Sequence, residues 1–146
     1  MERYCYFSPE IITEDELKAG YKFTHDLAKE RNFKRLIICV NNIQANQFIE
    51  KIFNSTTTKK LERYGIVVDG QVNIKLKTPK GLKSFDDIKI VFAIHPSQQL
   101  LQKLESNLNI EVLVVIAEVP PNGILKHLDN WADENNVERL EINPNK

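Results

Sequence analysis

The chain has 146 residues, of which 42% are hydrophobic and 27% are charged, and its 20 basic residues balance its 20 acidic ones. This length and composition predict a single globular domain, residues 1–146, with one sizeable core. Because the charges balance, the whole molecule sets up no field toward nucleic acid or an anionic membrane, and we expect neither as a partner.

Membrane spans, secretion signals, metal sites and nucleotide loops each have a sequence signature, and none is found here. The longest apolar run, residues 112–117, is far shorter than the roughly 18 residues that suggest a membrane span. No basic stretch followed by an apolar one opens the chain, so a cytoplasmic location is the default expectation. The cysteines and histidines lack the spacing of a disulfide framework or a zinc site, so we expect no metal. The glycines form neither a G-x-G-x-x-G turn nor a phosphate loop, so we expect no nucleotide cofactor.

The first helix is predicted to begin just after Thr13. Thr13 and Glu16 have the spacing of a capping box, in which each side chain bonds the backbone of the other residue. Apolar residues then recur at intervals of three and four, a pattern that predicts a buried helical stripe ending near Arg31. The aromatic residues ahead of this helix are Tyr4, Tyr6 and Phe7. We expect them to pack in the core, as a first strand or as a lid, with an oligomer contact as the alternative.

Three largely apolar segments, residues 35–40, 88–94 and 112–117, each lead into a polar or proline-bearing turn and then into a helical pattern. Such apolar runs suit strands that are covered by helices on both faces. Strands that alternate with helices predict an α/β fold, namely a three-layer Rossmann-like or flavodoxin-like domain with a mostly parallel central sheet.

The helices after the first two runs have candidate start and stop residues. Asn41 or Asn42 is expected to cap the first of them, and the polar run 54–58 is expected to end it. Pro96 suits the first turn of the next helix, whose apolar face would extend as far as Leu108. A last helix is predicted over residues 124–132, and a short final strand over 137–142.

Asp69-Gly70 is the strongest turn signal in the chain, and it predicts a hairpin at the edge of the sheet. The lysines that follow are Lys75, Lys77, Lys80 and Lys83. We expect them to protect an edge strand from pairing with another chain. The alternative, phosphate contacts with a base stacked on Phe85, would make this a nucleic-acid patch, which the balanced charge disfavours.

Polar residues follow the three buried strands and mark the candidate site. They are Asn41, Asn42, His95, Ser97 and Glu118, together with Asn122 and Gly123 at the start of the last helix. Open α/β sheets bind ligands at the carboxyl ends of their strands, where the strand order reverses. If the first two apolar strands are neighbours at such a point, the turns after them line one crevice. Each turn also opens a helix whose free amides favour an anion, so the sequence predicts a small polar or anionic ligand.

Each of these residues also has a structural interpretation. The two asparagines are good helix caps, and Ser97 lacks the G-x-S-x-G context of a nucleophile, so a helix-start hydrogen bond explains it well. His95 could act as an acid or a base near neutral pH, but no orienting partner is evident in the sequence. Glu118 follows an apolar strand that could raise its pKa and make it a base, or it could point into solvent.

Three functions follow from these observations. We favour a non-catalytic accessory or regulatory domain that binds a small polar or anionic ligand, or a protein partner, at the strand carboxyl ends. The rival is a small hydrolase or transferase in which His95 and Glu118 act as acid and base while Asn41 or Asn42 orients the substrate. That rival requires the two side chains to converge directly or through one water. The third possibility is a homo-oligomeric interaction protein.

Overall fold

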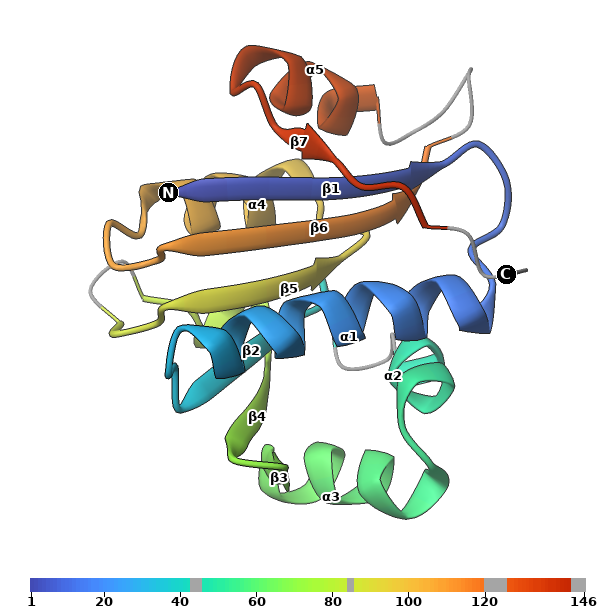
Figure 1. Cartoon of the computed structure of the whole chain (residues 1–146), viewed down its shortest axis with the longest axis vertical. Helices are drawn as coiled ribbons and strands as arrows, with labels where there is room; N and C mark the ends of the chain where they lie inside the picture. Colours follow the sequence, from blue (N-terminus) through green and yellow to red (C-terminus); the bar gives the residue numbers. More distant parts are fainter. Residues whose placement is uncertain (43–45, 84–85, 120–125, 143–146) are drawn as a thin grey trace.

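The computed structural model describes residues 1–42, 46–83, 86–119 and 126–142 (Figure 1). Its strands are β1 (Glu2–Ser8), β2 (Arg35–Cys39), β3 (Ile66–Asp69), β4 (Val72–Lys77), β5 (Ile90–Ile94), β6 (Val112–Glu118) and β7 (Glu138–Arg139). Its helices are α1 (Glu14–Glu30), α2 (Asn46–Ile52), α3 (Ser55–Tyr64), the 3-10 turn η2 (Pro79–Gly81), α4 (Gln98–Ser106) and α5 (Lys126–Glu134). None of the helices in the described part of the chain has the length and apolarity needed to span a bilayer.

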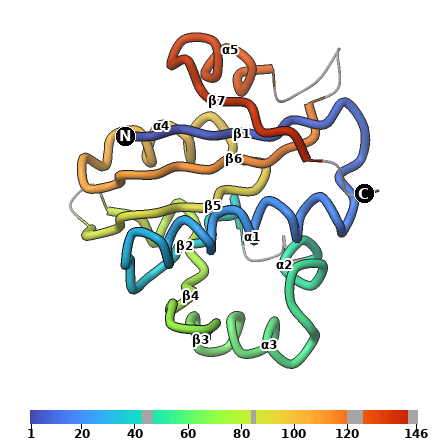
Figure 2. Tube along the Cα trace, viewed as in Figure 1, coloured from blue at the N-terminus to red at the C-terminus, as the bar shows by residue number. Residues whose placement is uncertain are grey.

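The strands form one seven-stranded sheet in the order β3-β4-β2-β5-β6-β1-β7. Every neighbouring pair is parallel except β3 and β4, which form an antiparallel hairpin at one edge. Asp69 pairs with Val72 across the two-residue turn, and Gly70 takes a φ of 66° there, in the left-handed region that glycine adopts without a side-chain clash. The predicted α/β fold and its edge hairpin are therefore confirmed. The aromatic amino-terminal segment is a strand, β1, inserted between β6 and β7 (Figure 2).

Helices cover the sheet on both faces, and the sheet separates two hydrophobic cores. On one face α1, α2 and α3 pack on alternate residues of β2, β4, β5 and β6. On the other face α4 and α5 pack on the intervening residues of β1, β2, β5 and β6. Helix α1 runs very close to the sheet at Gly20, because an added Cβ would lie only 3.1 Å from the Ile116 side chain and 3.2 Å from the Phe92 ring.

The amino terminus of α1 has the predicted capping box. The Thr13 hydroxyl accepts a hydrogen bond from the Glu16 amide at 3.2 Å, and the Glu16 carboxylate accepts one from the Thr13 amide at 2.9 Å. The other carboxylate oxygen of Glu16 accepts a hydrogen bond from the Tyr6 hydroxyl on β1. Burial alone would raise the pKa of Glu16, but the hydrogen bonds from Tyr6 and Thr13 outweigh it and lower that pKa.

Three local predictions were wrong. The polar run 54–58 begins helix α3 instead of ending α2, because the Asn54 side chain caps the new helix by accepting from the Thr57 amide at 2.8 Å. Helix α4 begins after Ser97, so Pro96 precedes the cap instead of occupying the first turn. Leu108 lies beyond the end of α4 and is 93% exposed, so it contributes nothing to the apolar face of that helix.

The expected role of the lysines was also wrong for β4. The outermost strand is β3, and β4 is an interior strand that pairs with both β3 and β2. Lys75 and Lys77 therefore do not protect a sheet edge. Because strand residues alternate between faces, these lysines point away from the face that α1 and α3 cover.

Candidate functional site

The strand order reverses between β2 and β5. These strands are parallel neighbours. From β2 the chain passes through α2 and α3 toward β3 and β4, whereas from β5 it passes through α4 on the opposite face toward β6. The carboxyl ends of β2 and β5 therefore form a topological switch point, the place where open α/β sheets bind ligands.

Asn41 ties the two strand ends together. Its side-chain amide donates to the His95 carbonyl oxygen at 2.7 Å, and its side-chain oxygen accepts from the Ser97 amide at 2.8 Å. Ser97 in turn caps α4 by accepting from the Leu100 amide at 3.1 Å. From the other side, His127 Nε2 lies 3.0 Å from the Pro96 carbonyl oxygen. Asn41 and Ser97 thus hold the turn after β5 in place, and both use their side-chain oxygens to do so.

His95 lies beneath α2. Its φ of 48° is in the left-handed region, which interrupts the alternation of β5 and turns the ring onto Phe48, with ring centroids 4.7 Å apart. Among the described residues, neither ring nitrogen has a hydrogen-bond partner. Burial lowers the pKa of His95, and the neighbouring Glu118 carboxylate opposes that shift. The His95 imidazole therefore binds a proton less readily than the imidazole of an exposed histidine.

Glu118 lies at the end of β6 on the same side of the sheet as His95. One of its carboxylate oxygens accepts a hydrogen bond from the Ile12 amide at 2.9 Å and lies 4.0 Å from His95 Nε2. That separation is too long for a direct hydrogen bond. The structure thus brings together the two side chains that the sequence predicted as acid and base.

A separate groove opens on the α4 side of the same strand ends. It has a volume of about 580 Å³ and is lined by Asn41, Asn42, Thr78, Pro79, Lys80, Gln99 and Lys103. Lys103 donates one hydrogen bond to the Pro79 carbonyl oxygen at 2.8 Å. Asn42 and Lys80 are exposed and make no hydrogen bond or ion pair with any other described residue. Their polar groups are available to a ligand.

The predicted site residues therefore fall into separate places. Asn41 and Asn42 line the groove, whereas His95 and Glu118 meet on the α1 and α2 side of the sheet. Ser97 caps α4 and does not line the groove. Asn122 and Gly123 lie outside the described residues.

Sequence reasoning missed the other half of the groove. Thr78, Pro79 and Lys80 follow β4, and Gln99 and Lys103 lie on α4. Lys80 stood out in the sequence only as part of a lysine cluster. The missing information was the pairing of β4 with β2, which brings the turn after β4 beside the turn after β2.

Metal and thiol chemistry have little support in the part of the chain that the structure describes. No group of three or more histidine, cysteine, aspartate or glutamate side chains there could hold a metal ion. Both cysteines are buried, and burial raises the pKa of Cys5 to about 11 and that of Cys39 to about 12. Neither thiol is ionised near neutral pH, so neither has the reactivity of a catalytic cysteine.

Comparison with the models of known protein families and with curated proteins gave no match to this chain. Function is therefore inferred from the side chains of the site.

Proposed function

We propose that this protein is a non-catalytic α/β domain that binds a small anionic ligand in the groove at the carboxyl ends of β2 and β4. The observation that carries the proposal is the pairing of an available ammonium group, Lys80, with an available amide, Asn42, beside the topological switch point. A cation and an amide are the groups that fix the charge and the orientation of a carboxylate or a phosphate.

The size and charge of the groove support an anion over a neutral ligand. Its volume of about 580 Å³ lies in the range of roughly 300–1,000 Å³ that is usual for small-molecule sites. Lys80 and Lys103 line it, and its described lining includes no carboxylate. A small organic acid or phosphate ester would therefore meet two positive charges with no acidic side chain between them.

The chemistry of the lining favours binding over catalysis. The described residues of the groove include no histidine, cysteine, serine, aspartate or glutamate, and Thr78 provides the one side-chain hydroxyl among them. Acid-base catalysis needs a group that exchanges protons near neutral pH, and nucleophilic catalysis needs an activated hydroxyl or thiol. The groove offers neither.

The test is a thermal-shift panel of di- and tricarboxylates and phosphate monoesters at constant ionic strength. We expect at least one of these anions to raise the unfolding temperature in a saturable way, since a ligand that binds only the folded state stabilises it. Lys80→Gln should abolish most of that rise, whereas Lys59→Gln, an exposed lysine on α3, should leave it unchanged. No stabilisation by any anion, or equal loss in both variants, would contradict the proposal.

The second candidate is a hydrolase or transferase that uses His95 and Glu118. It is favoured by the imidazole nitrogens, which have no partner among the described residues, and by the carboxylate oxygen 4.0 Å from Nε2. In this function the imidazole of His95 would remove a proton from a water or a hydroxyl group, and the Glu118 carboxylate would stabilise the imidazolium that forms. The test is turnover of ester, amide and phosphoester panels. Activity that His95→Asn and Glu118→Gln both abolish would favour the enzyme, and no turnover of any panel member would count against it.

A further inference from the structure

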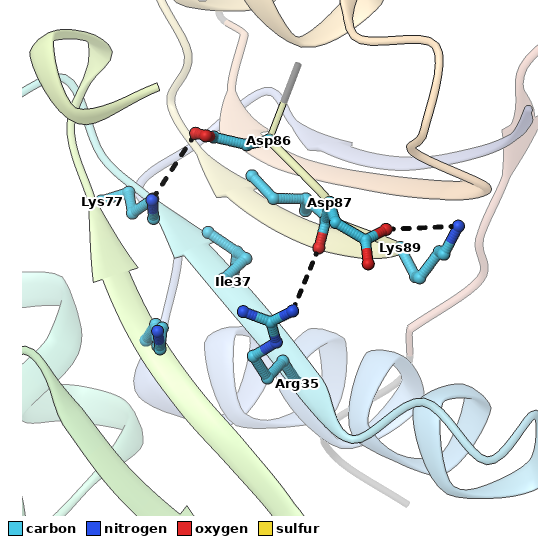
Figure 3. A pocket seen from close by; sticks show the side chains of 8 residues that line it. Arg35, Ile37, Lys77, Asp86, Asp87 and Lys89 are labelled. Atoms are coloured by element: carbon cyan, nitrogen blue, oxygen red, sulfur yellow. Dashed lines mark hydrogen bonds and ion pairs between the residues drawn. The ribbon is translucent and has the colours of Figure 1, made fainter. Parts of the chain in front are cut away.

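A second, smaller cavity lies between β2, β4 and the residues 86–89 that lead into β5 (Figure 3). Its volume is about 110 Å³, and it is lined by Arg35, Ile37, Lys75, Lys77, Asp86, Asp87, Ile88 and Lys89. It shares no lining residue with the groove at the strand carboxyl ends. The two are therefore separate candidate sites.

Strand geometry directs the basic side chains into this cavity. In β4, Val72 and Ile74 face the core under α1 and α3, so the lysines that alternate with them face the opposite side. Lys75 is paired in register with Ile37 of β2, and both line the cavity. Among the described residues, β3 and β4 contribute nothing to the core beneath α4 and α5. This side of β4 is therefore free to carry charge.

Arginine and lysine charges exceed acidic charges around the cavity. Four cationic side chains line it against two carboxylates, Asp86 and Asp87. The carboxylates are already engaged, since Lys77 lies 3.7 Å from Asp86 and Lys89 lies 3.4 Å from Asp87. Figure 3 shows the Lys77 and Arg35 side chains reaching from neighbouring strands toward this acidic segment.

Two of the four cations have no carboxylate partner among the residues that the structure describes. The Arg35 guanidinium donates to a backbone carbonyl oxygen, that of Asp87, at 3.4 Å. Lys75 makes no hydrogen bond or ion pair with any other described residue. Like charges that converge on one hollow repel each other, and a bound anion removes that repulsion.

We propose that this cavity binds a phosphate group or an equivalent tetrahedral oxyanion, held by Arg35 and Lys75. The planar guanidinium matches two oxygens of such an anion, and the lysine adds a point charge. The volume of about 110 Å³ equals the liquid-volume share of roughly four water molecules, at about 30 Å³ each. One phosphate group fits such a volume, whereas a whole nucleotide does not. The anion is either free phosphate or the terminal group of a phosphate monoester.

The experiment is a titration of the whole chain, followed by amide NMR at constant ionic strength, with inorganic phosphate in one arm and phenyl phosphate in the other. We expect saturable shifts of the backbone amides of Lys75 and Lys89 with phosphate. Equal or tighter binding of phenyl phosphate assigns a monoester, and weaker binding assigns the free ion. Arg35→Gln and Lys75→Gln should each weaken binding by roughly tenfold to a hundredfold, the usual effect of losing a charge-assisted hydrogen bond.

Two further variants test whether the effect belongs to this site. Lys60→Gln, an exposed lysine on α3, should leave the affinity that is read from the Lys75 and Lys89 amides unchanged. Asp87→Asn should strengthen binding by roughly threefold, because it removes a competing negative charge and keeps the backbone carbonyl that Arg35 uses.

Three results would overturn the proposal: shifts that do not saturate, equal weakening in the Lys60→Gln control, or weaker binding in Asp87→Asn. Unfolding curves in chloride show whether each variant is folded. If Arg35→Gln is unfolded, Lys75→Gln and Asp87→Asn still decide the question. If this proposal fails, the proposed function of the groove is unaffected, because the thermal-shift panel with Lys80→Gln tests the groove separately.

Discussion

The two halves of the sheet are built differently. In the half formed by β5, β6 and β1, helices cover both faces, and nearly every residue of β5 and β6 is buried. In the half formed by β3 and β4, helices α1 and α3 cover one face, while the other carries Lys75 and Lys77, with Arg35 at the start of the neighbouring strand β2. Both candidate anion sites border this second half.

The difference separates residues that specify the fold from residues that are available for binding. An apolar strand buried on both faces is explained by packing alone. A lysine on an interior strand is not explained in this way. Its charge gains nothing from an apolar neighbour, and an interior strand has no free edge for the charge to protect. The open half is therefore where function is expected, and the following predictions test that contrast.

The largest effect is expected where α1 packs on the covered half. Gly20→Val places new carbon atoms against the Ile116 side chain and the Phe92 ring, which already lie 3.1 and 3.2 Å from the position of a Cβ. We expect it to lower the free energy of unfolding by about 2–3 kcal/mol, the cost of overpacking a core. Gly81→Ala, with nothing within 4 Å of the added Cβ, is the control near the open half. Urea denaturation measures both, and an equal loss in the two variants would contradict the contrast.

A half-buried ionic contact holds the covered half together. Glu105 on α4 accepts hydrogen bonds from Arg3 at 2.7 and 2.8 Å and from the Trp131 indole at 2.7 Å, which links β1, α4 and α5. Burial acts to raise the pKa of Glu105, but Arg3 and Trp131 outweigh it and lower that pKa below the ordinary 4.5. The carboxylate therefore adds stability that is fully present above pH 4.5 and is lost as the pH falls through the lowered pKa.

Glu105→Gln should accordingly cost about 1–3 kcal/mol at pH 7 and little at low pH, because the native carboxyl is then neutral too. Glu50→Gln, an exposed glutamate on α2, is the matched control and should cost less than about 0.5 kcal/mol at either pH. Denaturation at the two pH values measures the difference. A cost for Glu105→Gln that does not depend on pH would contradict the ionic contact.

His95 should also make the free energy of unfolding depend on pH, in a window that begins at about pH 6.5 and extends below it. Burial lowers the pKa of His95 below its ordinary 6.5, so the unfolded chain binds the proton first. The contribution of His95 to stability is therefore complete above pH 6.5 and is lost as the pH falls through the interval below it. His95→Asn, a residue that tolerates the left-handed backbone found here, should flatten the stability profile between pH 7 and 5. An unchanged profile would show that the imidazole is not held neutral.

The smallest effect on stability is expected in the open half. Lys75→Gln removes a charge that has no partner among the described residues, so the free energy of unfolding should change by less than about 0.5 kcal/mol. Thermal denaturation in chloride buffer measures this change. A large loss would mean that Lys75 serves the fold, and it would remove the distinction between the two halves.

Local signals predicted much of the fold. The capping box at Thr13, the apolar runs that became β2, β5 and β6, and the Asp69-Gly70 turn all depend on neighbours in sequence, so one sequence suffices to find them. The helix at 55–64 was missed because Asn54, which was expected to end α2, caps the helix that follows it.

The candidate site depends on contacts between distant segments, and the sequence could not provide these. Asn41 was expected to cap a helix, but it bonds the turn after β5, 54 and 56 residues away in the chain. Lys75 and Lys80 were assigned to a sheet edge because strand order cannot be read from the spacing of apolar residues. Once β4 is placed between β3 and β2, the same lysines face two cavities.

The most direct test of function in the open half is an amide chemical-shift map recorded with the most stabilising small organic anion at constant ionic strength. We predict saturable shifts at Asn42, Lys80 and Gln99, with no comparable change along β6 or β1, and loss of those shifts in Lys80→Gln. Shifts confined to the surroundings of His95 and Glu118, or spread evenly over exposed lysines without saturation, would contradict a ligand site in the carboxyl-end groove.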